Sequence, residues 1–175
     1  KAAKGDVMPY TGNLKQVARI WRAYLMSELA DNFGPIAIDA FQGTNPQFND
    51  LKSAYYFMLA ELKDASAKLD VSVVNPDILK KGDPAYGYDY MKWRKYANSM
   101  RLRLAMRLSE VDPAKAKAEF EAAASGDLLT NATDIFQVQE RPGWDDLTGV
   151  MSREWNAQIL SVTLNNLYIG LGGVK

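Results

Sequence analysis

The sequence predicts an all-α fold of helical hairpins joined by long loops, and three observations support this prediction. Apolar side chains recur at the three-to-four-residue spacing of a single helix face in several separate segments. Glycine, proline, aspartate and asparagine gather between those segments, where they favour helix ends and turns. No segment alternates apolar and polar residues in the manner of a half-buried strand.

Composition limits the classes of function that are open to the chain. Its 175 residues are 47% hydrophobic, which is enough for one domain with a core. Lys+Arg and Asp+Glu both number 21, whereas a nucleic-acid binder usually carries excess positive charge, so we expect no nucleic-acid partner. Cys and His are absent, which excludes disulfides, cysteine nucleophiles, Ser-His triads and Cys/His zinc sites. We expect no cofactor, and any metal site would need oxygen ligands alone.

The two ends of the sequence indicate a piece of a longer protein. No apolar run approaches the ~20 residues that span a bilayer, and the N-terminal residues do not form a signal peptide. The sequence stops inside an apolar segment, "ILSVTLNNLYIGLGGVK", at a lysine of the kind that a trypsin-like cut leaves. We expect residues 1–175 to be a single helical domain and an internal fragment; a complete small protein is the alternative.

Two predicted helices occupy the first 70 residues. The first covers residues 14–33, with Asn13 as a possible cap, Gln16 as its capping-box partner and Gly34 as its end. The second begins near Asp50. Each has one apolar stripe, formed by Leu14, Val17, Ala18, Trp21, Leu25 and Leu29 in the first helix and by Leu51, Ala54, Tyr55, Met58, Leu62, Ala65 and Leu69 in the second.

The third helix lies in "DYMKWRKYANSMRLRLAMRLSE", residues 89–110, which carries six cations and no acid between Lys92 and Arg107. These cations fall on both sides of an apolar stripe and do not share a face. The pattern therefore predicts a central helix whose basic side chains cover apolar surface while their charged ends reach acids or water. The predicted stripe consists of Trp93, Ala97, Met100, Leu104 and Leu108.

Two further helices complete the prediction. One covers Pro113 to about Ala124, with Asp112 as its N-cap and Gly126 as its stop. Because only a few residues separate it from the third helix, the two should pack as an antiparallel hairpin. The last predicted helix covers about residues 152–167.

Two loops contain the candidate ligand-binding residues. Trp144 lies in "ERPGWDDLTG", where its ring could stack on the apolar face of a sugar while Asp145 and Arg141 hydrogen-bond its hydroxyls. The alternative is a tryptophan that folds back over the core. Tyr86 and Tyr88 of "YGYDY" offer a second aromatic loop, whose alternative role is to anchor the start of the third helix.

Signals for other chemistry are weak. "GLGGVK" lacks the spacing of a phosphate-binding loop and has no strand before it. The adjacent acids Asp145 and Asp146 could begin a calcium site, but such pairs are common in solvated turns and helix caps. A glycosidase needs two carboxylates across a cleft, and none of the 21 acids stands out as such a pair.

Three segments resemble the SusD/RagB family of outer-membrane proteins. "RIWRAYLMSELADNFGPIAI" is similar to the family's "RAYLF…LTDxFGDIPY", although it lacks the Asp and Tyr of that motif. "LKSAYYFMLAELKDASAKLD" is similar to the family's next helix, with its "LxELKxAxxxL" pattern. "DYMKWRKYANSMRLRLAMR" matches "GDxxKWxKFANSLRLRLAMR" almost position by position, and the resemblance extends over about residues 12–161.

The resemblance implies a superhelical scaffold of tetratricopeptide-like hairpins and a function without catalysis. It implies an outward-facing lipoprotein of the Gram-negative outer membrane, held only by an N-terminal lipid anchor that this chain lacks. Such a protein would bind oligosaccharide and deliver it to a SusC-like TonB-dependent transporter. A helical-hairpin adaptor that binds protein but no sugar is the alternative. The sequence leaves open which glycan, or which other cargo, is bound.

Overall fold

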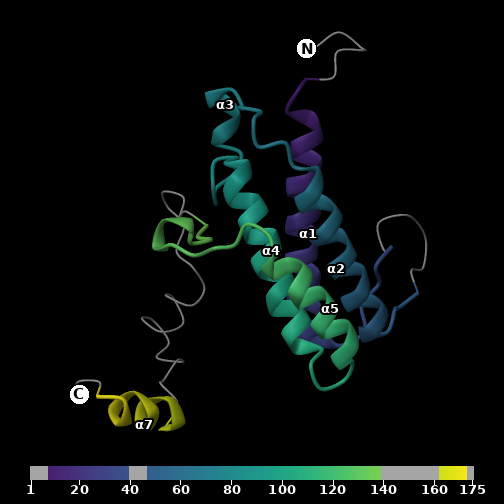
Figure 1. Ribbon diagram of the computed structural model, residues 1–175, viewed down its shortest axis with the longest axis vertical. Helices are drawn as coiled ribbons and strands as arrows, with labels where there is room; N and C mark the ends of the chain where they lie inside the picture. The colour runs from purple at the N-terminus through teal and green to yellow at the C-terminus, as the bar shows by residue number, and fades with distance from the viewer. Residues whose placement is uncertain (1–7, 40–46, 139–161, 173–175) are drawn as a thin grey trace, which may run out of the picture. The chain divides into compact units, whose positions relative to one another are not determined.

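The computed structural model describes residues 8–39, 47–138 and 162–172, and these residues are helices and loops without a strand (Figure 1). Only an isolated bridge joins Ile36 to Asn49. The chain divides into two units, Lys1–Val138 and Gln139–Lys175. The first unit contains α1 (Thr11–Phe33), α2 (Leu51–Lys68), α3 (Asp77–Lys80), α4 (Tyr90–Arg107), α5 (Pro113–Ala124) and the short 3₁₀ helix η2 (Ala132–Asp134); the second contains α7 (Val162–Gly170).

The core of the first unit lies where α1, α2 and α4 pack together (Figure 1). After a short turn, α5 runs back along α4, so the predicted antiparallel hairpin is confirmed. The predicted bounds of α5 are also confirmed, because the Asp112 carboxylate accepts a hydrogen bond from the Lys115 amide and Pro113 occupies the first turn. The fold is the predicted all-α arrangement of helical hairpins.

The apolar stripe of α4 is buried as predicted. Trp93, Ala97 and Leu104 have no exposed surface, and Met100 and Leu108 are nearly as buried. All six cations of the helix have partners. Lys92 and Arg94 donate to the carbonyls of Thr133 and Leu69, and Arg94 also pairs with Asp127. Lys95 pairs with Asp134, Arg101 with Glu119, Arg103 with Glu28, and Arg107 with Asp31 and the Tyr55 hydroxyl. The helix is therefore a central element of the scaffold and not an exposed basic ridge.

A buried ion pair joins the two helices of the hairpin. The Arg101 guanidinium donates to Glu119 at 2.9 Å, and both residues are buried. The Lys115 ammonium adds a second contact to the same carboxylate at 2.8 Å. Burial by itself would raise the pKa of Glu119, but the hydrogen bonds from Arg101 and Lys115 outweigh it and lower that pKa. The carboxylate is thus held in its charged form.

The predicted capping box of α1 is wrong. The helix begins at Thr11, and Tyr10 before it makes no side-chain cap. Asn13 lies inside the helix and is buried, where its amide donates to the Asp70 carbonyl at 2.7 Å and accepts from the Asp70 amide at 2.9 Å. The Gln16 side chain donates to the Gly12 carbonyl. A pair of hydrogen bonds to a distant loop has replaced the local cap, which sequence spacing alone cannot indicate.

The apolar stripe predicted for α2 is buried almost entirely, whereas most of the stripe predicted for α1 is not. In α2 the predicted residues are buried except Leu51, which is 44% exposed. In α1 only Val17 of the predicted stripe is buried, whereas Leu25 and Leu29 are 53% and 49% exposed. The face of α1 that packs on the core is instead formed by Asn13, Gln16, Val17, Ile20, Ala23, Met26, Ser27 and Ala30.

The last predicted helix is confirmed only where it overlaps α7, at residues 162–167. The rest of that predicted helix, residues 152–161, lies outside the described part of the chain. Within the described part of α7 the large apolar side chains are exposed.

We expect Glu119→Gln to lower the free energy of unfolding by about 2–3 kcal/mol near pH 7, because it leaves the buried Arg101 charge without its anionic partner. The folded-state pKa of Glu119 lies below its ordinary 4.5, so this stabilisation is present above about pH 4.5 and is lost as pH falls through the lowered value. Urea unfolding followed by circular dichroism near pH 7 and near pH 3 measures the difference.

The control for that experiment is Glu121→Gln, which removes an exposed carboxylate that pairs with Lys117 on the same helix. Because exposed ion pairs contribute little, this variant should lose no more than about 0.5 kcal/mol. A loss in Glu119→Gln that is the same at both pH values would contradict the assigned role of the ion pair.

Candidate functional site

An aromatic cluster connects α1 and α4 to the loops on either side of the hairpin. The Tyr96 and Phe136 rings are stacked with centroids 4.1 Å apart, and Trp93 meets Tyr86 edge to face at 5.4 Å. Such pairs contribute beyond the area that they bury. The cluster consists of Trp21, Tyr24, Tyr86, Trp93, Tyr96 and Phe136.

The buried Asp83 carboxylate shapes the loop that precedes α4. One oxygen accepts hydrogen bonds from the backbone amides of Ala85 and Tyr86, at 3.0 and 3.3 Å. The other accepts from the Tyr88 amide at 2.8 Å and from the Trp93 indole at 2.6 Å. Four donors thus converge on one side chain, which satisfies a charge that would otherwise be costly to bury.

Backbone strain marks the same loop. Gly87 and Tyr88 both have left-handed backbone angles, with φ of 58° and 60°. A tyrosine in this region is uncommon and costs of order 1 kcal/mol or more, so surrounding contacts must hold it there. The hydrogen bond from the Tyr88 amide to Asp83 is one such contact. The loop therefore has a fixed shape, in which the half-buried Tyr88 ring packs against the core of the first unit.

Tyr86 and Tyr88, the two tyrosines predicted to bind a ligand, lie in the same loop but in different surroundings. The Tyr86 ring belongs to the aromatic cluster and its hydroxyl donates to the Asp134 carbonyl at 2.8 Å; burial raises its pKa to about 12. Its contacts fit the anchoring alternative, and ligand binding by Tyr86 and Tyr88 stays a prediction. Trp144, Asp145 and Arg141 lie outside the described residues.

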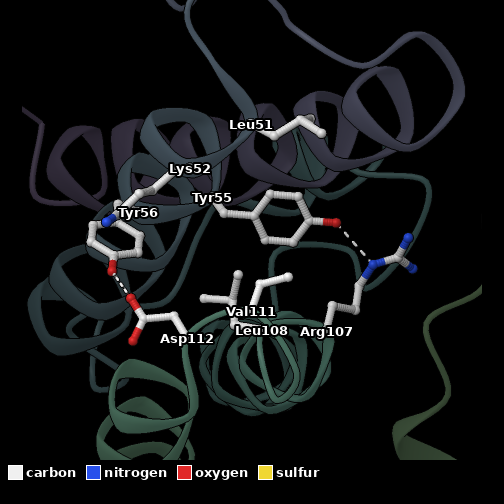
Figure 2. Close-up of a pocket in the computed structure, with 8 residues that line it drawn as sticks. All are labelled: Leu51, Lys52, Tyr55, Tyr56, Arg107, Leu108, Val111 and Asp112. Carbon is white, nitrogen blue, oxygen red and sulfur yellow. Dashed lines mark hydrogen bonds between the residues drawn. The ribbon is translucent and has the colours of Figure 1, made fainter.

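A second candidate site, which sequence reasoning missed, is a pocket between the start of α2 and the end of α4. Its volume is about 450 Å³, within the range of small-molecule sites. Figure 2 shows Leu51 on one side of the pocket and Leu108 and Val111 on the other, with the Tyr55 ring between them and Tyr56 toward the end near Asp112. The stripe pattern assigned Tyr55 to the core, and no signal marked the turn at Val111 as a pocket wall. The lining residues are Leu51, Lys52, Tyr55, Tyr56, Arg107, Leu108, Val111 and Asp112.

Polar groups at both ends of the pocket are already paired. At one end the Arg107 guanidinium donates to the Tyr55 hydroxyl at 2.8 Å (Figure 2). The same guanidinium pairs with Asp31 at 2.7 Å. At the other end the Tyr56 hydroxyl donates to Asp112, and this bond lowers the pKa of that carboxyl and raises the pKa of the phenol.

The chemistry that remains available in the pocket is mainly apolar contact. Leu51 and Val111 are 44% and 78% exposed, and burying such side chains is favourable by about 25 cal/mol per Å² of apolar surface. The charged groups form a rim that would fix the orientation of a partner. An apolar centre with a charged rim is the arrangement of a protein–protein contact.

Neither a metal site nor a membrane-spanning helix is found among the described residues. These residues contain no group of three or more acids, histidines or cysteines that could hold a metal ion. None of the described helices combines the length and the apolar character that crossing a bilayer requires.

Comparison with known families decides the identity of the chain. The family model described as "Susd and RagB outer membrane lipoprotein" matches residues 3–172. The chain belongs to the SusD-like family. The predicted resemblance is thereby confirmed over nearly the whole sequence. None of the curated proteins compared with the chain matches it.

Solved structures of SusD homologues share the fold. A homologue from Parabacteroides distasonis is 33% identical with a TM-score of 0.73, and the match covers 83% of this chain and 30% of that one. A chitin-binding homologue from Flavobacterium johnsoniae is 28% identical with a TM-score of 0.76 and coverages of 87% and 32%. A homologue from Bacteroides vulgatus, 24% identical with a TM-score of 0.80 and coverages of 94% and 34%, supports the fold alone.

These matches confirm the predicted fold class of tetratricopeptide-like helical hairpins. They also show that the SusD-like chain spans only about a third of the length of these solved relatives.

We expect Asp83→Ala to lower the free energy of unfolding by roughly 3 kcal/mol, because four donors lose their acceptor. The near-ultraviolet circular dichroism should weaken as well, since the Trp93 indole loses its anchor within the aromatic cluster. Asp83→Asn keeps one acceptor oxygen and should fall between the wild type and Asp83→Ala. Equal losses in both variants would contradict a role based on hydrogen-bond acceptance.

Proposed function

We propose that this SusD-like chain takes part in non-catalytic capture of oligosaccharide at the outer-membrane surface and in its delivery to a SusC-like TonB-dependent transporter. The observation that carries the proposal is family membership over residues 3–172, together with a chitin-binding relative that is 28% identical. The family description as an outer-membrane lipoprotein supports an outward-facing location at the outer membrane.

Sugar capture is assigned to the aromatic loops. Trp144 would stack on a pyranose ring while Asp145 and Arg141 bind its hydroxyls, and Tyr86 and Tyr88 would supply a second aromatic surface. The strained and hydrogen-bonded loop around Tyr88 supports this assignment, because a rigid loop presents a ring at a low entropic cost.

We expect Trp144→Ala to weaken binding of a chito-oligosaccharide by about tenfold, equivalent to roughly 1.4 kcal/mol, because the ring that stacks on the sugar is lost. Titration calorimetry with chitotetraose measures the affinity, and maltohexaose tests whether another glycan is preferred. Trp21→Phe is the matched control, since Trp21 packs against Trp93 and Phe136 in the aromatic cluster.

Unchanged affinity in Trp144→Ala would reject that residue as the platform while keeping glycan capture. An absence of binding to a broad glycan panel would favour the second candidate function, a helical-hairpin adaptor that binds protein alone. Release of reducing sugar by the purified chain would contradict both, because neither includes catalysis.

The pocket between α2 and α4 supports a contact with another protein, whether the chain captures glycan or acts only as an adaptor. Its exposed Leu51 and Val111 need an apolar partner, and the hydroxyls of Tyr55 and Tyr56 are already hydrogen-bonded. We assign it to an aliphatic side chain of the transporter.

We expect Val111→Asp to weaken binding to the SusC-like transporter by tenfold or more, since a charge would be buried against an apolar side chain. Val74→Asp is the control, because Val74 is 77% exposed, close to the 78% of Val111, but lies outside the pocket. Biolayer interferometry with detergent-solubilised transporter measures both variants. Equal binding by the two variants would exclude the pocket from this interface.

A further inference from the structure

The pocket between α2 and α4 belongs to a larger apolar area at one end of the first unit. The start of α2 and the turn between α4 and α5 lie at the lower end of that unit in Figure 1. The bridge between Ile36 and Asn49 joins the segment after α1 to the segment before α2. Both of these segments add a strongly exposed aromatic ring to the exposed pocket residues, Phe33 at 77% and Phe48 at 75%. An apolar area of this kind is typical of a protein-binding surface.

Most positive charge beside the pocket is neutralised by carboxylates of the same chain. Arg107 forms the ion pair with Asp31 described above. Lys115, which lies 5.1 Å from the centroid of the Tyr56 ring, pairs with Glu119. Lys52 lies over the same ring at 5.5 Å, but it forms no ion pair with any described residue.

Two carboxylates flank the pocket from opposite sides. Asp50 precedes Leu51 and caps α2, where its carboxylate accepts a hydrogen bond from the Ser53 amide at 2.7 Å, which lowers the pKa of Asp50. Glu110 precedes Val111 in the turn after α4 and is exposed. Neither acid forms an ion pair within the part of the chain that the structure describes. Both are therefore available to a cation from outside.

The edge of the pocket is consequently negative. Asp50, Glu110 and Asp112 contribute three carboxylates and Lys52 offsets one of them, which leaves two negative charges in excess. Such an edge repels anionic surfaces such as lipid phosphates and attracts positive charge. Because complementary charge directs association and selects partners, the pocket fits a protein segment that carries positive charge beside an apolar side chain.

We propose that the transporter segment that enters this pocket carries lysine or arginine on both sides of its aliphatic residue, and that these cations pair with Asp50 and Glu110. The inference rests on the proposed function, because it takes the SusC-like transporter as the partner. It adds the sign of the charge on the partner's surface and the two residues of this chain that select it.

Neutralising both carboxylates tests the pairing. Asp50→Asn removes the charge but keeps the cap of α2, since asparagine caps a helix about as well as aspartate, and Glu110→Gln changes an exposed side chain. The double variant should therefore fold. The matched control is Asp77→Asn with Asp127→Asn, which removes the same charge from two exposed carboxylates outside the pocket.

We expect Asp50→Asn with Glu110→Gln to slow association with the detergent-solubilised transporter about fivefold at about 50 mM salt and less than about twofold at about 500 mM, because salt screens the charges. Dissociation should change less than about threefold, since the apolar contact remains. The control should associate within about twofold of the wild type. Biolayer interferometry on the full-length natural polypeptide measures both rates.

Unchanged or faster association of the double variant would overturn the inference and leave the transporter contact standing. Equal slowing in the control would also overturn it, because net charge and not position would then govern the rate. A wild-type protein that does not bind the transporter would instead contradict the proposed function, and the inference would fail with it.

Discussion

The structure depends on how the Trp93 indole is buried. Its ring has no exposed surface and packs against Trp21, Tyr86, Tyr96 and Phe136, while its N–H donates to the Asp83 carboxylate. A buried indole needs such an acceptor, and a buried carboxylate needs such donors. Because Asp83 also holds the loop before α4, the same bond connects the core of the bundle with the shape of the candidate binding loop.

Charge pairing explains how a helix with six cations can lie at the centre of a neutral protein. The side chains of α4 reach acids or carbonyls on α1, α5 and the flanking loops, so each cation ties the helix to another element. Only the Arg101–Glu119 pair is fully buried; the others keep contact with water and contribute less. The basic segment is thus part of the scaffold.

Much of the fold could be predicted from local pattern, and the sequence marked the loop with Tyr86 and Tyr88 as a candidate site, whereas the pocket and the role of Asp83 could not be predicted. The Asp112 cap and Pro113 marked the start of α5, and helical spacing identified the buried stripe of α4. The pocket at Leu51 and Val111 had no sequence signal, because it is formed by residues about 60 positions apart. The Asp83 carboxylate was missed for a similar reason: one acid in a loop does not reveal which donors surround it.

The sequence by itself determined the four long helices of the first unit, their hairpin and the family, because periodicity, caps and a long motif are local properties of the chain. Tertiary structure alone decided which face of α1 is inside. Both faces carry apolar residues, so the apolar pattern does not indicate which of them is buried. The face with Ile20 and Ala23 is buried because it packs against α2 and α4. The buried amide of Asn13 belongs to that face, since its two bonds to Asp70 exist only once the chain has folded.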